Sequence, residues 1–391
     1  MRLLYAHRTR SADGQRVHID ALTGALVRAG VEVFLCGPDG VREAGTAPGT
    51  LDAAAGEAGW RVALPQAIHE GAELAYSARE AARLRGAITR LKPDAVYERY
   101  NLFAHGVQAA RGRLPWLLEV NAPLAEERAR HSGLSLRAPA RLSERRLWRG
   151  ADAVLPVTAV LADMIREEGV PPSRIHVVPN GVDERFSAAG DGATVREKHG
   201  LQDAFVLGFT GFVRDWHGVE GALRWLPRRA NAALLLVGDG PHVAALRGEA
   251  EALGVADRLI VTGTVQREAV PAHIAAFDVA LQPAATRYAS PLKLQEYMAM
   301  GRAILACDQP NIREVVADGE SAVLFPPGDE PAMHAGLDRL SADEALRTRL
   351  GTGARETVAR RNLTWDGNAQ RVVAIAEELI EGGRARGARP S

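Results

Sequence analysis

Lysine and cysteine are both scarce in this chain of 391 residues, and neither sign of charge is in excess. Its 48 basic residues balance 48 acidic ones, which argues against a protein that coats nucleic acid or an anionic membrane. Cys36 and Cys307 stand far apart and form no Cys-x-x-Cys pair. A disulfide framework and a cysteine zinc site are therefore disfavoured. Only three basic residues are lysines: Lys92, Lys198 and Lys293.

Long apolar runs are also missing, since none reaches the roughly 18 residues that a membrane-spanning helix needs. The N-terminus soon turns polar, so we expect no signal peptide. Hydrophobic residues make up 47% of the chain and charged residues 25%, as in globular proteins with a sizeable core. Unpaired cysteines suit a reducing compartment, and we expect cytoplasmic localisation.

Short aliphatic runs alternate with segments of helical periodicity along nearly the whole chain. This alternation predicts βαβ units and open parallel sheets, hence the α/β class. Strands are expected at 3–7, 32–36, 95–98, 116–120, 153–157, 175–178, 205–210, 233–237, 259–262, 279–282, 303–306 and 322–325.

The alternation of strand and helix patterns is interrupted at Pro179–Asp183 and resumes after it, which indicates two domains. We expect an N-terminal domain over 1–183 and a C-terminal domain over 184–366. Residues 367–391 are predicted to form a helix that returns to the N-terminal domain, followed by a frayed tail. Ligands bind beyond the carboxyl ends of strands in such sheets, so two facing domains would enclose a binding cleft.

The loop between the first strand and the first helix contains a single glycine, Gly14. A glycine turn before a helix lets a ligand approach the backbone near the helix N-terminus. The loop lacks the G-x-G-x-x-G pattern, and no acidic residue closes the second strand, so a dehydrogenase is disfavoured. A plain strand-to-helix turn is the alternative.

Glycines also follow two strands of the second domain. In the loop 208–218, Arg214 and His217 stand three residues apart, as on one side of a turn, which suits a diphosphate. A solvated arginine is the alternative. Gly238 and Gly240 end the next strand, where a structural turn is the favoured explanation of this motif taken alone.

The segment 288–307 carries the strongest signal. Ser290 is predicted to cap a helix that starts at Pro291. Lys293 then lies in the first turn, where the helix dipole disfavours a cation, and a bound phosphate would resolve that conflict. Glu296, one turn on, could accept hydrogen bonds from a diol such as ribose. The alternative is a Lys293–Glu296 surface ion pair worth about 0.3 kcal/mol.

In order and spacing these motifs resemble glycosyltransferase family 4, retaining enzymes that use nucleotide sugars. The resemblance covers nearly the whole chain and implies the GT-B fold, two facing Rossmann-like domains with parallel sheets and an inter-domain cleft. It rests on the glycine loop with His18 and on the segments 175–183, 236–241, 257–265, 296–301 and 312–316.

The resemblance also implies a donor held by the C-terminal domain. In the E-x7-E motif of the family, Glu296 is the second glutamate, but Tyr288 occupies the place of the first. The chain resembles instead a branch with Tyr-x-Ser-Pro-Leu-Lys. The arginine and lysine that bind phosphate in the family correspond to Phe212 and His217.

We therefore expect Arg214 and Lys293 to act in catalysis by stabilising the leaving diphosphate. Donor contacts are expected from Gly14, His217, Gly238, Thr264, Val265, Tyr288, Ser290, Pro291, Leu292 and Glu296. Acceptor contacts are expected from His18, Glu98, Arg99, Asn121 and Glu126.

The predicted activity is retaining transfer of a sugar from a nucleotide diphosphate, UDP rather than GDP, to a glycan, lipid-linked or small-molecule acceptor. No Asp-x-Asp motif is present, so no metal and no cofactor are expected. Alternatives are a non-catalytic sugar-nucleotide-binding subunit and a sugar-nucleotide epimerase. The arginine row from Arg137 to Arg149 could contact a membrane, but a solvated helix face is favoured.

Overall fold

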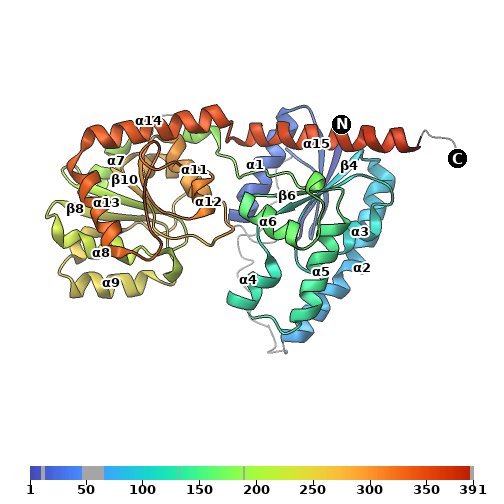
Figure 1. The fold of residues 1–391 in the computed structure, drawn as a ribbon, viewed down its shortest axis with the longest axis horizontal. Helices are drawn as coiled ribbons and strands as arrows, with labels where there is room; N and C mark the ends of the chain where they lie inside the picture. The colour runs from blue at the N-terminus through green and yellow to red at the C-terminus, as the bar shows by residue number, and fades with distance from the viewer. Residues whose placement is uncertain (10–13, 46–65, 132, 188–189, 388–391) are drawn as a thin grey trace. The chain divides into compact units, whose positions relative to one another are not determined.

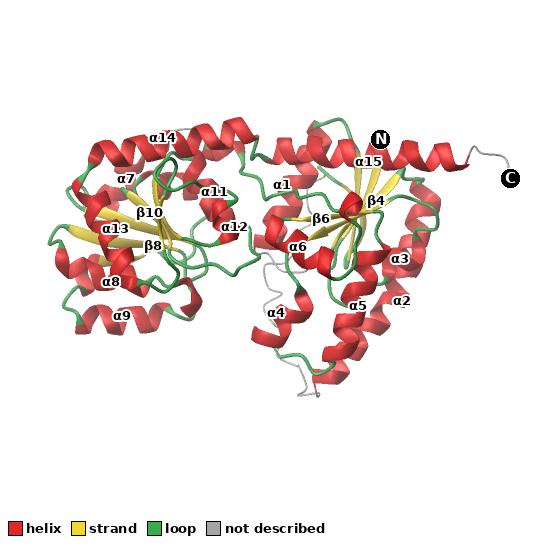
Figure 2. Ribbon diagram, viewed as in Figure 1, coloured by secondary structure: helices red, strands yellow, loops and turns green. Residues whose placement is uncertain are grey.

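The computed structural model describes most of the chain, in the residue ranges 1–9, 14–45, 66–131, 133–187 and 190–387. These residues form two compact units (Figure 1). Unit 1 contains Met1–Pro179 and Trp365–Ser391, and unit 2 contains Asn180–Thr364. In each unit, helices cover the two faces of a central sheet (Figure 2). No helix among the described residues has the length and apolar character to cross a membrane.

The sheet of unit 1 has six strands in the order β3-β2-β1-β4-β5-β6. They are β1 (Arg2–Ala6), β2 (Glu32–Gly37), β3 (Gly40–Glu43), β4 (Ala95–Arg99), β5 (Trp116–Val120) and β6 (Ala153–Pro156). All neighbours are parallel except β2 and β3. The helices are α1 (Gly14–Arg28), α2 (Gln66–Leu91), α3 (Gly106–Ala110), α4 (Leu124–His131), α5 (Arg137–Gly150), α6 (Ala159–Glu167) and α15 (Trp365–Gly387).

The sheet of unit 2 also has six strands, in the order β12-β11-β10-β7-β8-β9. They are β7 (Phe205–Thr210), β8 (Ala232–Val237), β9 (Leu259–Val261), β10 (Val279–Gln282), β11 (Ala303–Cys307) and β12 (Val323–Phe325), all parallel to their neighbours. The helices are α7 (Gly192–Lys198), α8 (Glu220–Trp225), α9 (Val243–Ala252), α10 (Val270–Ala275), α11 (Leu292–Ala299), α12 (Pro310–Arg313), α13 (Glu330–Ala342) and α14 (Glu344–Arg361).

Two features of unit 1 differ from the prediction. The expected strand 175–178 is not a strand of the sheet. The N–H groups of His176 and Val178 donate to the carbonyls of Val154 and Pro156 at 2.9 Å each, but the segment forms only an isolated bridge, between Ile175 and Val154. The edge strand β3 was missed because its sequence, Gly-Val-Arg-Glu, is short and mostly polar. It turns back from β2 through Gly40, whose φ of 117° suits glycine.

The two units divide after Pro179 and after Thr364, a few residues before the expected limits of 183 and 366. The N–H of Val182 donates to the carbonyl of Leu363, 3.0 Å away, which ties this segment to unit 2. The buried Asn368 side chain donates to the carbonyl of Pro179 at 2.6 Å, and α15 packs on α1. The last helix is therefore part of unit 1.

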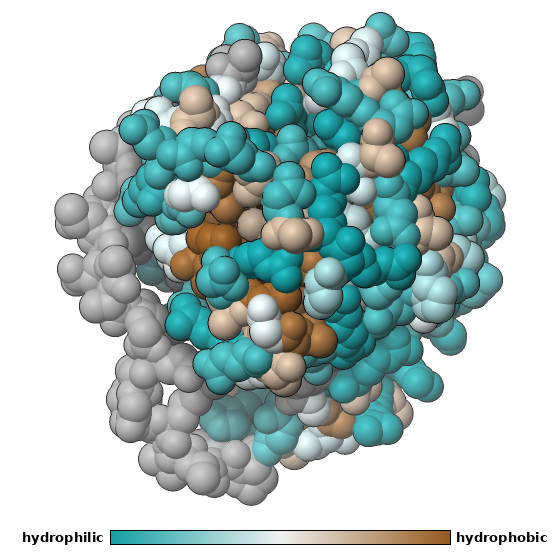
Figure 3. All heavy atoms as spheres, turned by 90° about the vertical axis from the view of Figure 1, so that its left-hand side faces the viewer, coloured by the Kyte–Doolittle hydropathy of each residue, from teal (hydrophilic) through white to brown (hydrophobic). Residues whose placement is uncertain are grey.

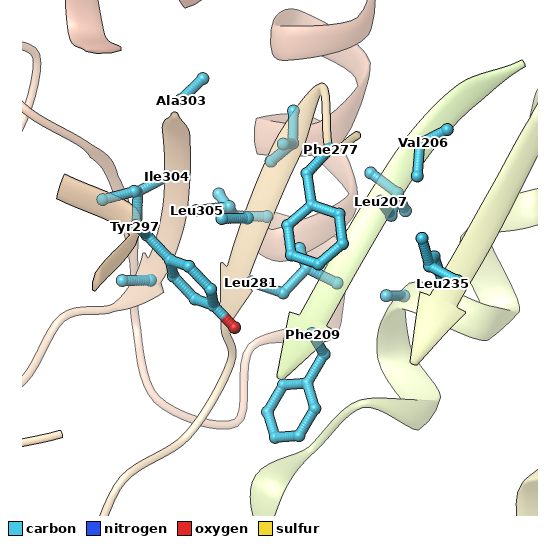
Figure 4. Close-up of a cluster of buried hydrophobic side chains, with 14 of the residues drawn as sticks. Val206, Leu207, Phe209, Leu235, Phe277, Leu281, Tyr297, Ala303, Ile304 and Leu305 are labelled. Atoms are coloured by element: carbon cyan, nitrogen blue, oxygen red, sulfur yellow. The ribbon is translucent and has the colours of Figure 1, made fainter. Parts of the chain in front are cut away.

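Aliphatic and aromatic side chains fill the core of unit 2 (Figure 4). Gly208 leaves room for the Phe277 ring, since a Cβ there would lie 2.1 Å from it. The hydroxyl of Tyr297 points toward β7 (Figure 4) and accepts a hydrogen bond from the Thr210 N–H at 2.8 Å. The β7–β10 pairing reaches only Gly208, so Tyr297 replaces a strand partner that Thr210 lacks on that side.

The face of the molecule seen in Figure 3 is largely hydrophilic, with hydrophobic side chains in limited areas between hydrophilic ones. Such scattered apolar surface is ordinary for a globular protein.

We predict that Tyr297→Phe lowers the free energy of unfolding by about 1–3 kcal/mol, because the Thr210 N–H loses its acceptor in a buried place. Chemical denaturation measures the loss. Thr210→Val is the matched control, since it removes only the second contact of Tyr297, at 3.0 Å, and leaves the N–H bond. An equal or larger loss in the control would contradict this account.

Candidate active site

The loops after β7 and β8 touch backbone to backbone at the carboxyl edge of the unit 2 sheet. The Gly211 N–H donates to the Val237 carbonyl at 2.9 Å, and the Val213 N–H donates to the Asp239 carbonyl at 2.8 Å. Gly238 has a φ of 144°, and a Cβ there would lie 2.2 Å from the Gly211 carbonyl oxygen. The glycine is thus required by close packing, and it keeps the edge open to a ligand.

The loop before α11 is held by hydrogen bonds from the segment that follows unit 1. Asn180 donates through its side chain to the Ser290 carbonyl at 2.7 Å and through its backbone N–H to the Ser290 hydroxyl at 3.4 Å. The predicted cap is therefore wrong. The cap residue is Pro291, whose ψ of 116° lies outside the helical range, and Leu292 is the first helical residue.

Lys293 lies in the first turn of α11, half-buried against the glycine loop. Its Nζ is 3.9 Å from the centroid of the Phe209 ring, and its Nζ and Cε are 3.5 Å from where a Cβ on Gly211 would lie. Among the described residues Lys293 forms no ion pair, so the alternative Lys293–Glu296 bridge is not formed. Burial lowers the pKa of Lys293 to about 7, although Glu296 opposes the shift.

His217 stands beside Lys293, in a 3-10 turn over Asp215–His217. Its Nδ1 accepts the Arg214 backbone N–H at 3.1 Å, and its ring centroid is 5.1 Å from that of Phe209. Burial lowers its pKa to about 3, helped by Lys293 and Arg214. His217 is therefore a neutral imidazole that shapes the loop, while positive charge resides on its neighbours.

Arg214 is exposed and its guanidinium is flanked by aromatic rings. It lies 4.9 Å from the centroid of Phe212 and 4.8 Å from that of Trp216, and both rings are exposed, at 57% and 41%. Its charge and that of Lys293 both act on His217, so the two cations share one edge of unit 2.

Glu296 lies one turn beyond Lys293 on α11. Burial raises its pKa, while Arg267 and Lys293 oppose the shift. Asp183 and Arg185 also act on it electrostatically, Asp183 raising the pKa and Arg185 lowering it. A carboxyl group in such surroundings can accept from, or donate to, a pair of hydroxyls.

The other predicted donor residues line the same edge. Thr264 is exposed just after β9, and Val265 packs against the core. Tyr288 is buried in the loop before α11. That loop is held by Asn311, whose side chain donates to the carbonyls of Thr286 and Ala289 at 3.0 and 2.7 Å. Asn311 and Asn180 were missed, because an asparagine that anchors a distant loop has no spacing signal.

In unit 1, Glu119 collects polar groups at the carboxyl edge of the sheet. Its carboxylate accepts from His18 Nε2 at 3.1 Å and from the Tyr97 hydroxyl at 2.8 Å. Arg99 and the Asn121 amide also donate to it. Burial would raise its pKa, but His18 and Arg99 outweigh burial and hold the pKa below its usual range. Three predicted acceptor residues thus meet around a carboxylate that was not singled out.

Other expected residues lie elsewhere. Glu98 points to the opposite side of β4 from Arg99. There the pKa of Glu98 is raised, mainly by burial and also by the nearby charge of Glu80. Glu126 is on α4, paired with Arg130 at 2.9 Å. Gly14 begins α1, but the preceding loop residues 10–13 lie outside the described residues.

The arginine row on α5 makes contacts within unit 1. Arg145 forms an ion pair with Glu168 at 2.6 Å, and Arg149 donates to the Glu168 carbonyl at 2.6 Å. Arg137 donates to the Leu134 carbonyl at 3.4 Å, while Arg141 is exposed. Ion pairing of this kind is typical of a solvated helix face.

Within the described ranges, no group of three or more histidine, cysteine, aspartate or glutamate side chains could hold a metal ion. Lys293 and Arg214, at the carboxyl edge of the unit 2 sheet, are cations that could meet an anion.

Two family models match the chain, one mainly over unit 1 and the other within unit 2. Residues 12–186 match Glycosyltransferase Family 4, and residues 192–357 match Glycosyl transferases group 1. The chain has the GT-B fold, and the matches support a glycosyltransferase. Within that class they support family 4, as the motifs indicated.

Among curated relatives, an alpha-D-kanosaminyltransferase of Streptomyces kanamyceticus is 29% identical over 55% of this chain and 58% of the relative. A GDP-mannose-dependent alpha-(1-6)-phosphatidylinositol monomannoside mannosyltransferase of Mycolicibacterium smegmatis is 29% identical over 64% of this chain and 68% of the relative. A D-inositol 3-phosphate glycosyltransferase of Xylanimonas cellulosilytica is 31% identical over 63% and 61%. The chain thus spans 58% to 68% of the length of these relatives.

Solved structures share the fold. A sucrose-phosphate synthase from Thermosynechococcus elongatus has a TM-score of 0.76 at 18% identity, over 98% of this chain and 100% of that one. HepE from Anabaena, solved with UDP, has a TM-score of 0.72 at 16% identity, over 97% of this chain and 100% of the HepE chain. At such identities the likeness concerns the fold alone, and it confirms the predicted GT-B architecture.

We predict that Gly238→Ala sharply reduces both the Tm and nucleotide binding, because the new Cβ would collide with the Gly211 carbonyl. Thermal unfolding and calorimetry measure the two effects. Gly248→Ala is the matched control. It lies in α9 with no atom within 4 Å of the added Cβ, and alanine there should add up to about 1 kcal/mol of stability. Normal nucleotide binding by Gly238→Ala would refute the close-packing argument.

Proposed function

We propose that the protein is a retaining glycosyltransferase that moves a sugar from a nucleotide diphosphate, with Lys293 and Arg214 at the leaving diphosphate. The observation that carries the proposal is Lys293 itself, a half-buried cation without an ion-pair partner among the described residues, at the start of α11. Retaining such a group costs stability unless an anion binds beside it. The glycine loops let a diphosphate come that close.

In the proposed reaction, the bond from the anomeric carbon to the diphosphate oxygen breaks, and a bond to an acceptor oxygen forms on the same face. The proton of the acceptor hydroxyl leaves with the diphosphate. Negative charge grows on the leaving oxygens, and Lys293, Arg214 and the N–H groups at the start of α11 stabilise it. The reaction is proposed to need no metal ion, since these cations take that role.

The remaining contacts with the nucleotide sugar are assigned from the positions of residues at the carboxyl edge of the unit 2 sheet. Glu296 is assigned to the ribose hydroxyls, and the backbone at Thr264 and Val265 to the base. Tyr288, Ser290, Pro291 and Leu292 border the start of α11 and are assigned to the sugar and phosphates. UDP is proposed over GDP, as in the solved HepE complex, although a relative named above uses GDP-mannose.

The polar cluster in unit 1 is assigned to the acceptor. Hydroxyl groups of a sugar or cyclitol ring match the mixture of donors and acceptors that His18, Arg99 and Asn121 present around Glu119. Two of the relatives have inositol-containing substrates in their names, which supports a polyhydroxylated ring as acceptor.

A thermal-shift screen with nucleotide diphosphates and their sugars tests the donor class, since binding to the native state raises the Tm. Transfer is then measured with UDP-glucose or GDP-mannose and with glucose or D-inositol 3-phosphate. Epimerised donor formed without an acceptor would identify an epimerase instead. Binding without transfer or donor hydrolysis would identify a non-catalytic subunit.

We predict that Lys293→Ala weakens nucleotide-diphosphate binding by about 10- to 100-fold, the cost of a lost charge-assisted hydrogen bond. Folding should be nearly unaffected, because Lys293 forms no ion pair with described residues. Calorimetry gives the affinity. Lys198→Ala, on the exposed surface of α7, is the control and should bind normally. Equal affinity for both variants would exclude the phosphate role of Lys293.

Diphosphate affinity should fall as the pH rises through about 7. Burial has lowered the pKa of Lys293 to about 7, so its ammonium is present below that pH and is lost above it. Glu296 and His217 are the nearby titratable groups, but the pKa of His217, about 3, lies far below this window. The affinity is measured between about pH 6.5 and about pH 8.5.

Lys293→Arg provides the comparison, because a guanidinium stays charged throughout this range. The fall in affinity should be present in the wild-type chain and absent in Lys293→Arg. The same fall in both proteins would assign the titration to another group.

A further inference from the structure

The ring of His18 is fixed from two directions at the edge of unit 1. Its Nε2 lies 3.1 Å from an oxygen of Glu119, and its ring meets the edge of Trp365 at a centroid distance of 4.7 Å and an angle of 73°. Trp365 is the first residue of α15. Rotation of the ring would break one contact or the other, so His18 presents one defined atom, Nδ1. Among the described residues, Nδ1 has no hydrogen-bond partner.

Glu119 itself has little capacity left for a ligand. The Tyr97 hydroxyl occupies Oε2, while His18, Arg99 and Asn121 share Oε1. A carboxylate accepts about four hydrogen bonds. Because all of these donors belong to the protein, Glu119 is committed to holding its neighbours in place. Its depressed pKa also makes it a poor proton acceptor.

We infer that Glu119 is a positioning residue, which binds Nε2–H of His18 so that Nδ1 contacts a hydroxyl of the acceptor sugar or cyclitol. The inference rests on the proposed function and deepens it. Nδ1 orients the acceptor hydroxyl, and the proton of that hydroxyl still leaves with the diphosphate. The returning helix α15 takes part through Trp365, which closes the other side of the ring.

Two substitutions distinguish the contribution of Nδ1 of His18 from that of Nε2. In His18→Gln, the amide nitrogen can take the place of Nε2 and donate to Glu119, but nothing replaces Nδ1. In His18→Asn, the amide group lies near the place of Nδ1, but the bond to Glu119 is lost. Both variants are made in the full chain, and their Tm and nucleotide-diphosphate affinity are measured first.

We expect His18→Gln to keep a Tm and a donor affinity close to those of the wild type. Its KM for D-inositol 3-phosphate or glucose, with UDP-glucose or GDP-mannose as donor, should rise at least about tenfold, with a smaller change in kcat. His18→Asn should lower the Tm, because Glu119 loses a buried partner. Wild-type KM in His18→Gln would overturn the inference and leave the proposed function standing.

Histidine 15N spectra of the wild-type chain test the geometry without turnover, with the His18 signals assigned from their loss in His18→Gln. A proton on Nε2 is expected, and an Nε2 without a proton would overturn the assignment. If the wild-type chain transferred sugar to no acceptor, the proposed function and this inference would both fail. A lowered Tm in His18→Gln equal to that in His18→Asn would show a purely structural histidine and would also overturn it.

Discussion

The contact between the backbones of Gly238 and Gly211 is the constraint on which the carboxyl edge of the unit 2 sheet depends. It joins the loops after β7 and β8 at a distance that no side chain would permit. Gly211 has a φ of 117°, which favours glycine, and Lys293 lies against this loop and over the Phe209 ring. Gly238 is thus needed for the close packing of the two loops, and Gly211 for the backbone conformation beside the cation.

Arginine and lysine have different structural roles in this chain, and the scarcity of lysine follows from that difference. Arginine forms the structural ion pairs, such as Arg196 with Asp278 at 2.8 Å and Arg224 with Glu249. Its guanidinium stays charged and binds in a fixed geometry. A lysine can be half-buried without a partner because its pKa falls, and an anion can restore its charge. Lys293 is the lysine in such a place, whereas Lys198 is exposed.

The two units handle charge in opposite ways. In unit 2, Lys293 and Arg214 lie beside the glycine loops and form no ion pair with a carboxylate of the described residues, which favours an anionic ligand. In unit 1, four side chains donate hydrogen bonds to one buried carboxylate, Glu119, although the charge of Arg99 alone would balance it. Hydrogen bonds to one carboxylate hold those donors in place, and under the proposed function the remaining polar atoms of His18, Arg99 and Asn121 would meet hydroxyls of the acceptor. Preorganised groups in both units reduce the cost of ordering substrates.

The sequence by itself determined the α/β class, the parallel strands and the motifs at the strand ends, because period-two and helical patterns reflect local burial. It also pointed to Lys293, through the conflict between a cation and a helix start. Local patterns failed where a partner was distant. Ser290 binds Asn180 and does not cap α11, and Glu119 binds side chains from β4 and α1. Only the tertiary structure could decide these, since hydrogen bonds between residues far apart in the chain leave no periodic trace.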